Sequence, residues 1–326
     1  GNRINLFAGR ISRNYGILND FSTTFSNNAY PFDHYGFSAN NNRLKYTFYF
    51  SRLNDMENSF DSQGILIQDG DTLKTKRYFS FQHIDFIPNK ILQIGLSQVA
   101  LYGGVNQTFE GTMMNPMNFY YADQRNSRTQ INVLWQGLIA LRLFNNGLLY
   151  IDFLIDDFII NNDASDERDV NSDRLALKIK YSIVDLFNNS LLSIIYTHID
   201  NYTYTSYRNF ENYIFHQKGI GLPFNSYRGI EIINSYFVDS DNIFDISVSY
   251  YAKGNNSLFN SFIEKKEVSL IEPVLYFVNL KSKISKSLFN RFSLNYELFY
   301  EIESLDSSIK NGLSSYGHDF RLIFHI

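Results

Sequence analysis

Large apolar and polar side chains alternate along many segments of about ten residues in this chain. In the last of these, residues 316–326, the apolar Phe320, Leu322 and Phe324 take alternate positions between mostly polar neighbours. Because successive side chains of a strand point to opposite faces, each such segment predicts a β-strand with one apolar face. The clearest segments span residues 44–51, 149–156, 175–183, 244–251, 292–301 and 316–326, and weaker ones span 3–10, 34–41, 76–87, 90–101, 131–144, 190–201, 229–238 and 268–284. The sequence therefore predicts about fourteen strands.

Short and long connections alternate between these segments. The short ones consist mainly of Asn, Asp, Pro and Ser, which favour tight turns, and they span residues 40–42, 88–89, 145–146, 186–189, 239–241 and 285–288. The long ones span residues 11–33, 55–75, 102–130, 159–172, 202–228, 254–267 and 304–313. A soluble sandwich with Greek-key crossings has no reason to alternate in this way, whereas an up-and-down outer-membrane barrel has short turns at one end and long loops at the other. We therefore predict an all-β, antiparallel up-and-down transmembrane β-barrel, a single domain over residues 1–326.

The composition is compatible with a barrel and argues against several other classes. The chain has 30 Phe and 24 Tyr but one Trp, and such aromatic residues are typical of strands and membrane-interface girdles. A net charge of −4 without any basic run argues against nucleic-acid binding. No run of apolar residues is long enough to predict a transmembrane helix. The absence of Cys excludes disulfides and thiolate metal sites.

The sequence contains none of the common catalytic or nucleotide-binding motifs. The six His are scattered over different elements, and a polar role at strand ends or in the lumen explains them more simply than pairing with a Ser nucleophile: His34, His83, His198, His216, His318 and His325. Asp152 and Asp156 share a polar face with Lys178 and Lys180 of the next strand, which predicts cross-strand ion pairs in a wet lumen. We predict no enzymatic activity and no cofactor.

Several short motifs resemble the capsule-assembly (Wzi-type) outer-membrane barrels. They are Gly9-Arg10, residues 26–33 (SNNAYPFD), residues 95–98 leading to 102–104, Asn115-Pro116 and residues 156–158, in the order of the family. The resemblance implies a barrel of about eighteen strands that holds capsular polysaccharide at the cell surface as a lectin, without enzymatic activity. Compared with that family, the chain lacks a signal sequence and an N-terminal helical segment, so we expect it to lack early strands. It also ends in Ile326, where an aromatic residue is more typical.

The resemblance and the Tyr-, Asn- and Arg-rich loops together predict a saccharide-binding surface. Tyr rings offer faces on which sugars stack, and Arg pairs with acidic groups. The predicted ligand residues are Arg13, Tyr30, Tyr120, Tyr121, Arg125, Tyr207, Arg208, Tyr227 and Arg228. The long loops would face the cell exterior, with surface polysaccharide and outer-membrane lipid as partners of a monomeric protein. A diffusion channel with a constricted lumen is the alternative, because ordinary loop composition explains these residues about as well.

A second set of residues is predicted to be structural. It comprises Arg10, Asp33, Asp152, Asp156, Asp157, Lys178 and Lys180. Arg10 is placed at the exterior end of the first strand, and Asp156-Asp157 at the exterior end of the seventh. A guanidinium–carboxylate network between them would hold an inward-folded 11–33 loop and plug the pore.

Overall fold

The computed structural model describes residues 3–16, 22–58, 73–105, 107–126, 131–144, 146–157, 174–206, 208–259, 270, 272–288, 292–307, 309 and 312–324. One antiparallel 15-stranded sheet contains nearly all of its strands: each pairs with its neighbours along the chain, and the short β4 (Met56–Asn58) pairs with β5. Its other strands are β1 (Arg3–Ile11), β2 (Phe32–Asn40), β3 (Leu44–Arg52), β5 (Leu73–Phe86), β6 (Leu92–Val105), β7 (Ile131–Leu143), β8 (Gly147–Asp157), β9 (Arg174–Val184), β10 (Ser190–Ile199), β13 (Tyr227–Phe237), β14 (Asn242–Lys253), β15 (Leu275–Leu288), β16 (Phe292–Ser304) and β17 (Leu313–Phe324).

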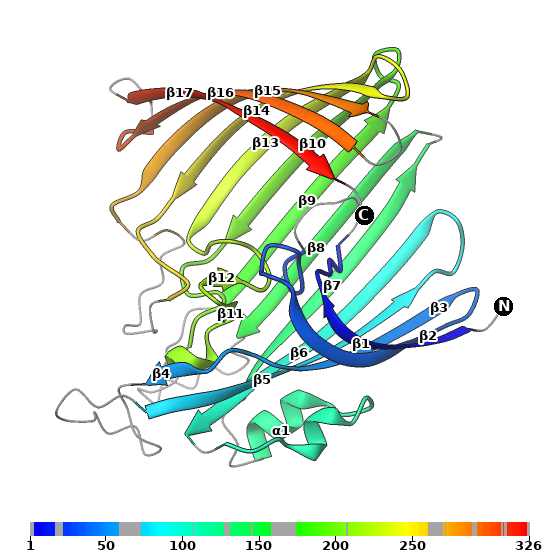
Figure 1. Ribbon diagram of the computed structural model, residues 1–326, viewed down its shortest axis with the longest axis vertical. Coiled ribbons are helices and arrows are strands. Elements are labelled where there is room, and N and C mark those ends of the chain that lie inside the picture. Colours follow the sequence, from blue (N-terminus) through cyan, green and yellow to red (C-terminus); the bar gives the residue numbers. More distant parts are fainter. Residues whose placement is uncertain are drawn as a thin grey trace, which may run out of the picture.

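The sheet curls into the wall of a barrel, with short turns at one end and long connections at the other (Figure 1). We call these the turn end and the loop end. β1 and β17 are the two edges of the sheet among the described residues. The predicted antiparallel up-and-down fold is confirmed, as is the alternation of short and long connections.

Three of the short turns are stabilised by the same hydrogen-bond pattern. In each, one side-chain oxygen accepts two following backbone N–H groups, as Asn and Asp do when they stabilise a tight turn. Asn41 accepts from residues 43 and 44, Asn89 from 91 and 92, and Asp239 from 241 and 242, all at 2.8–3.0 Å. The turn chemistry is thus encoded locally.

Two sequence-based boundaries near the C-terminus are wrong. The predicted strand over residues 268–284 begins later, at Leu275. Pro273 lacks the N–H that a ladder needs, which fits a strand that begins after it. The turn predicted over residues 285–288 is strand, because β15 continues to Leu288 and pairs with β16 as far as Phe292.

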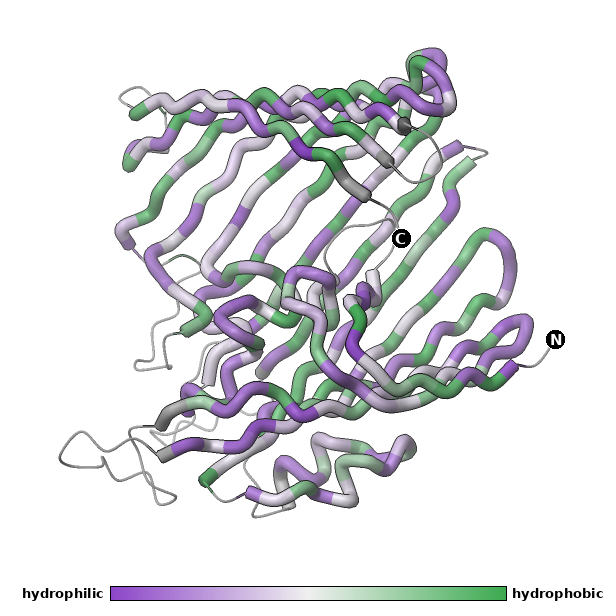
Figure 2. Tube along the Cα trace, in the orientation of Figure 1, coloured by the Kyte–Doolittle hydropathy of each residue, from purple (hydrophilic) through white to green (hydrophobic). Residues whose placement is uncertain are grey.

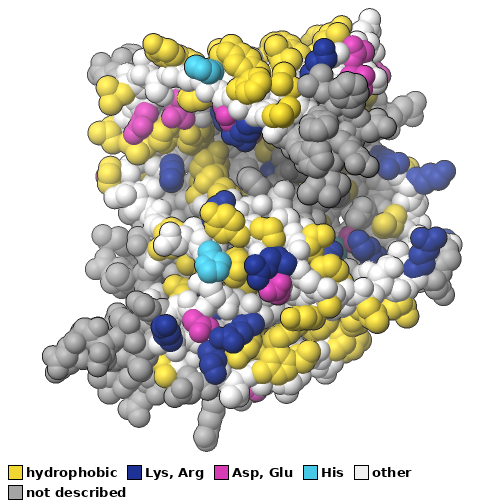
Figure 3. Space-filling model, in the orientation of Figure 1, with side chains coloured by type: hydrophobic (Ala, Val, Ile, Leu, Met, Phe, Trp, Pro, Cys, Tyr) yellow, Lys and Arg dark blue, Asp and Glu magenta, His cyan; other side chains and the backbone are white. Residues whose placement is uncertain are grey.

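Hydrophobic and polar residues alternate along the strands, and hydrophobic side chains gather on the outer side of the curved sheet (Figures 2 and 3). Outward residues such as Phe153 and Leu298 are 39% and 46% exposed, as expected for a surface that meets lipid. Asp152, Lys178 and Lys180 lie on the opposite, concave face, which we call the luminal face.

The helices lie in the long connections: η1 (Gly111–Met114), α1 (Tyr120–Asn126) and η2 (Asn209–Glu211). A small hairpin of β11 (Ile214–Phe215) and β12 (Lys218–Gly219) also lies in a long connection. In the described part of the chain, no helix is long and apolar enough to span a membrane.

Several of the long connections pack against the sheet. Residues 12–16 and 22–31, the inner loop, and residues 200–206 and 208–226, the hairpin loop, pack on its luminal face, where Phe25, Tyr204 and Leu222 join the strand residues Phe79 and Phe81 in one buried cluster. Residues 107–126, the outer segment, pack on the opposite, convex face (Figure 1).

Candidate functional site

The inner loop is anchored to the luminal face of β7 and β8. The Asp152 carboxylate is fully buried and accepts hydrogen bonds from the Thr23 backbone N–H at 3.0 Å and the Thr23 hydroxyl at 2.5 Å. Gln136 donates to Asp152 at 2.8 Å and accepts from the Thr24 hydroxyl at 2.6 Å. Asp152 lies opposite Lys178 in the strand register, so a buried cation neighbours this carboxylate. The inner loop is therefore held by buried, charge-assisted hydrogen bonds.

The hairpin loop is anchored from β5 and β8. The fully buried Arg77 guanidinium donates to the backbone carbonyls of Phe210 and Asn212, each at 2.6 Å. The Asp156 carboxylate accepts the backbone N–H of Tyr204 at 2.6 Å. Sequence reasoning missed Arg77, although a charged residue followed by Phe79 and Phe81 on the same face was a visible signal.

The inner loop and the hairpin loop also hold each other. The Ser26 N–H donates to the Ile220 carbonyl at 2.8 Å, and the Ser26 hydroxyl to the Gly221 carbonyl at 2.5 Å. The Tyr204 hydroxyl donates to the Thr23 carbonyl at 2.5 Å. Together the two loops form one packed body on the luminal face, with an apolar centre and polar anchors on the wall.

Polar residues at the tip of the hairpin loop are exposed at the loop end. His216, Gln217 and Lys218 are exposed. The backbone N–H of His216 donates to the side-chain oxygen of Asn54, just beyond β3, at 3.2 Å. The Lys218 ammonium lies 4.2 Å from the centre of the Tyr30 ring, which is 52% exposed. The tip thus presents a cation and an aromatic ring on a fixed support.

Burial changes the titration of a carboxyl group in the hairpin loop. Burial raises the pKa of Glu211 above its ordinary value, although hydrogen bonds from Ser206 at 2.5 Å and Arg208 at 3.2 Å act in the opposite direction. The loop therefore favours a protonated Glu211 more than the unfolded chain does.

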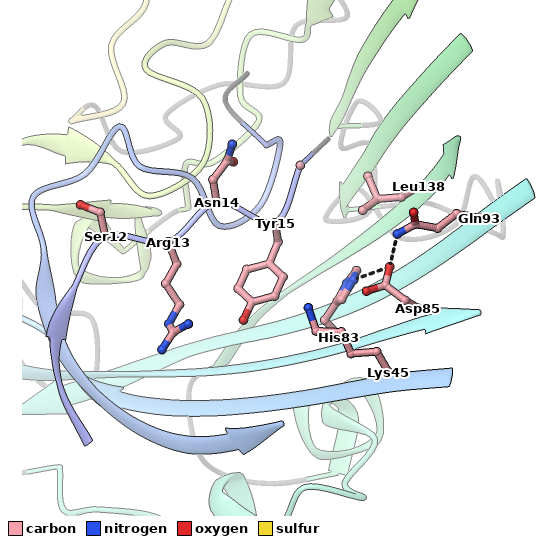
Figure 4. Close-up of a pocket in the computed structure, with 10 residues that line it drawn as sticks. Ser12, Arg13, Asn14, Tyr15, Lys45, His83, Asp85, Gln93 and Leu138 are labelled. Carbon is pink, nitrogen blue, oxygen red and sulfur yellow. Dashed lines mark hydrogen bonds and ion pairs between the residues drawn. The ribbon is translucent and has the colours of Figure 1, made fainter. Parts of the chain in front are cut away.

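A polar pocket of about 390 Å³ lies between the inner loop and the wall (Figure 4). The inner loop contributes residues 12–16, and the wall contributes Lys45, His83, Asp85, Gln93 and Leu138. Its cations, Arg13 and Lys45, outnumber its one carboxylate, Asp85, so the pocket is suited to a polar or anionic group. Arg13 is itself fixed, because its Nε donates to His34 Nε2 at 2.6 Å and its guanidinium carbon lies 4.3 Å from the centre of the Tyr49 ring.

His83, Asp85 and Ser97 form a hydrogen-bonded chain that has the composition of a catalytic triad. His83 Nε2 lies 3.0 Å from Asp85, and His83 Nδ1 lies 2.8 Å from the Ser97 hydroxyl. However, the Ser97 hydroxyl donates to Gln136 at 2.7 Å, so its proton points away from His83. Ser97 is 2% exposed and does not line the pocket. This series of hydrogen bonds therefore links the wall to Gln136, which anchors the inner loop. Among the described residues, no group of three or more His, Asp and Glu could hold a metal ion.

The structure separates the predicted ligand residues. Tyr30 and Arg208 lie at the loop end, where Arg208 is paired with Glu211. Tyr120 is fully buried in the outer segment, so its predicted role as an exposed stacking face is wrong. Arg13 lines the luminal pocket instead of the exterior surface.

The remaining predicted ligand residues occupy different surroundings. Tyr227 is half-buried against Phe224 and Tyr251, whereas Arg228 is exposed. Tyr121 is half-buried in the outer segment. Tyr207 and the side chain of Arg125 lie outside the described part of the structure.

The predicted network between Arg10 and Asp156 is also wrong. Arg10 pairs with its register partner Asp33 at 2.7 Å, and both side chains are exposed. They lie on the outward face, because Phe7 and His34 occupy the luminal positions of the same strands. Asp156 and Arg77 hold the hairpin loop instead. Lys180 is buried on the luminal face, and the side chain of Asp157 is not described.

A meandering antiparallel wall with an apolar outer face, short turns at one end and loops folded onto the luminal face defines an outer-membrane β-barrel. Residues 1–158 match the model of the capsule assembly protein Wzi family. The resemblance to capsule-assembly barrels is thereby confirmed over this part of the chain.

A solved barrel shares the fold. The Escherichia coli outer-membrane protein Wzi, described as a carbohydrate-binding β-barrel involved in group 1 capsule assembly, aligns with a TM-score of 0.64 and 12% identity over 98% of this chain and 67% of that one. Pseudomonas aeruginosa OpdQ aligns with a TM-score of 0.48 and 12% identity over 98% of this chain and 77% of that one. OccD1 (OprD) aligns with a TM-score of 0.49 and 9% identity over 99% and 74%. No curated protein sequence matches the chain.

Proposed function

We propose that this protein binds a surface polysaccharide, in the manner of a capsule-attachment lectin, and catalyses no reaction. The observation that carries the proposal is the match of residues 1–158 with the capsule assembly protein family. The described part of the structure supports it with a luminal body built from two loops and with an exposed polar and aromatic tip at the loop end. With this function, the loop end faces the cell exterior.

The arrangement of the loops favours binding over diffusion. The inner loop and the hairpin loop are joined by buried hydrogen bonds and by a shared apolar cluster. Separating the two loops costs free energy, because the separation would expose apolar residues and leave buried carbonyls unpaired. A transport route past these two loops would require this opening.

We assign the first contact with the polymer to Tyr30, Lys218, His216, Gln217 and Arg208. The Tyr30 ring and the polar tip suit a sugar ring, and the Lys218 and Arg208 cations suit uronate or other acidic groups. Each exposed contact is weak, so retention depends on many repeat units that bind together. Binding of an acidic polymer should weaken as the salt concentration rises, because exposed charges are screened.

Capsule retention by intact cells tests the proposal. Cells that carry the wild-type protein are compared with cells that carry the double variant Lys218→Ala and Tyr30→Ala, and cell-bound and released polysaccharide are measured. We expect the double variant to release more polysaccharide at equal protein levels in the outer membrane. Lys90→Ala is the matched control, because Lys90 is an exposed cation at the turn end.

Equal retention by the double variant and the wild type would contradict the assigned site. Shortening the hairpin loop then tests the function itself: retention that is unchanged in a correctly inserted barrel favours a channel. Conductance in planar bilayers separates these classes independently, since a binding barrel with a packed lumen should pass almost no current.

A further inference from the structure

The outer segment, residues 107–126, covers part of the barrel wall on the side that faces away from the lumen (Figure 1). Beneath it lies a buried cluster that includes Phe48 and Tyr102 of the wall and Met113 and Tyr120 of the segment. The Phe109 ring lies 4.5 Å from Phe50, between ring centres. This long connection therefore does not extend away from the loop end, but descends along the outside of β3, β5, β6 and β7.

Polar side chains on the outward face of the wall bind the backbone of the outer segment. The Ser80 hydroxyl donates to the Met113 carbonyl at 2.8 Å. Gln82 and Gln98 both donate to the Asn118 carbonyl, at 3.1 and 2.8 Å, and the Tyr46 hydroxyl donates to the Pro116 carbonyl. At membrane depth every backbone polar group needs a hydrogen-bond partner within the protein, because lipid offers none. These outward polar residues supply that partner, and in a bare wall they would face lipid.

The length of the uncovered wall places the outer segment at membrane depth. A tilted strand needs about 9–11 residues to cross the hydrocarbon layer. On β5, the exposed outward apolar residues are Ile84 and Phe86, which lie next to the turn end. On β3, the exposed outward apolar residue is Leu44, which also lies next to the turn end. By contrast, β14 exposes Ile246, Val248 and Tyr250 along its length. The hydrocarbon layer must therefore extend over the part of β3 and β5 that the segment covers.

The outward surface of the segment carries several large apolar side chains, interspersed with the exposed polar residues Thr108, Thr112, Asn115 and Gln124. Met117 is 84% exposed, Phe119 is 53% exposed, and Phe109 and Met114 are each 41% exposed. This surface continues the exposed apolar wall at Leu96 of β6, which is 55% exposed. Within the segment, the charged Glu110 and Asp123 are half-buried and accept hydrogen bonds from Gln107 and Asn118, which reduces the cost of placing them near lipid.

We propose that the outer segment is a lipid-facing layer embedded in the acyl-chain region of the outer membrane. In this region the wall has two layers, and Met114, Met117 and Phe119 meet lipid in place of strand side chains. The long connection between β6 and β7 thus belongs to the membrane surface of the protein and not to its polysaccharide-binding surface.

Site-directed spin labelling tests this proposal in the purified full chain reconstituted into phospholipid vesicles. The chain has no Cys, so a single introduced Cys carries the only label. Met117→Cys is compared with Leu298→Cys, on the outward face of β16, and with Gln217→Cys, at the exposed tip of the hairpin loop. Collision rates are measured with oxygen, which concentrates in lipid, and with a water-soluble nickel chelate.

We expect the label at position 117 to match position 298, with an oxygen-to-nickel ratio several-fold higher than at position 217. A ratio equal to that at position 217 would place the segment in water and overturn the proposal. Protection from both reagents would also overturn it, because protein would then cover the segment. Met114→Cys repeats the measurement at a second exposed site, so that failure of one variant to fold leaves the proposal testable.

Discussion

Arg77 should control whether the hairpin loop stays packed in the lumen. Arg77→Met keeps a long side chain but removes both hydrogen bonds from the guanidinium, to the carbonyls of Phe210 and Asn212. A hydrogen bond from a charged group contributes about 1.5–3 kcal/mol. The two together stabilise the packed loop by about 3–6 kcal/mol, and each 1.4 kcal/mol is a factor of ten. We expect the open fraction of the loop to rise by a factor of about 10² or more.

Thiol labelling measures this open fraction. Leu222, which is 3% exposed in the luminal cluster, is replaced by the only Cys of the chain, and its rate of modification reports how often the loop opens. Arg52→Met is the matched control, since Arg52 is exposed and, among the described residues, forms an ion pair with Asp55 three residues later. Such surface pairs contribute about 0–1 kcal/mol, so the control should change labelling little.

A labelling rate in Arg77→Met within about threefold of the parent protein would refute the reasoning, because about 0.7 kcal/mol is too little for two charge-assisted hydrogen bonds. In that case the apolar cluster alone would hold the loop, and Arg77 would merely tolerate burial.

Three further predictions concern the packed loops. Asp152→Ala should destabilise the protein by about 3–5 kcal/mol in urea unfolding, because it leaves the two Thr23 donors without an acceptor and a buried cation without its carboxylate. Asp152→Asn should destabilise it less, and equal effects of the two variants would contradict this. The raised pKa of Glu211 should make the hairpin loop most stable at acidic pH, with stability lost as the pH rises from the ordinary carboxyl pKa to the raised one. Loop labelling against pH should show this dependence in the wild type, and Glu211→Gln should flatten it. Gly221→Ala should separate the inner loop from the hairpin loop, because a Cβ there would lie 2.3 Å from the Thr23 carbonyl oxygen, whereas Gly111→Ala, with open space around it, should change neither labelling nor stability.

The strands and turns could be predicted from the sequence because their signals are local. Alternation with period two needs only neighbouring residues, and Asn41, Asn89 and Asp239 stabilise their turns by accepting N–H groups two and three residues ahead. The boundary errors at residues 268–288 arose where a Pro and a run of Ser and Lys weakened the alternation. The resemblance to capsule-assembly barrels likewise rested on short motifs that the chain carries in order.

Only the tertiary structure decided where the loops go. The inner loop and the outer segment both contain Asn, Tyr and Phe, yet one packs inside the barrel and the other outside it. Their positions depend on partners more than a hundred residues away, such as Thr23 with Asp152, or on outward strand residues such as Gln98. A polar side chain on an outward strand position looks like an ordinary interruption of the pattern until the backbone that it binds is known. Alternation therefore determined the wall, whereas contacts between distant residues determined what lies on each side of it.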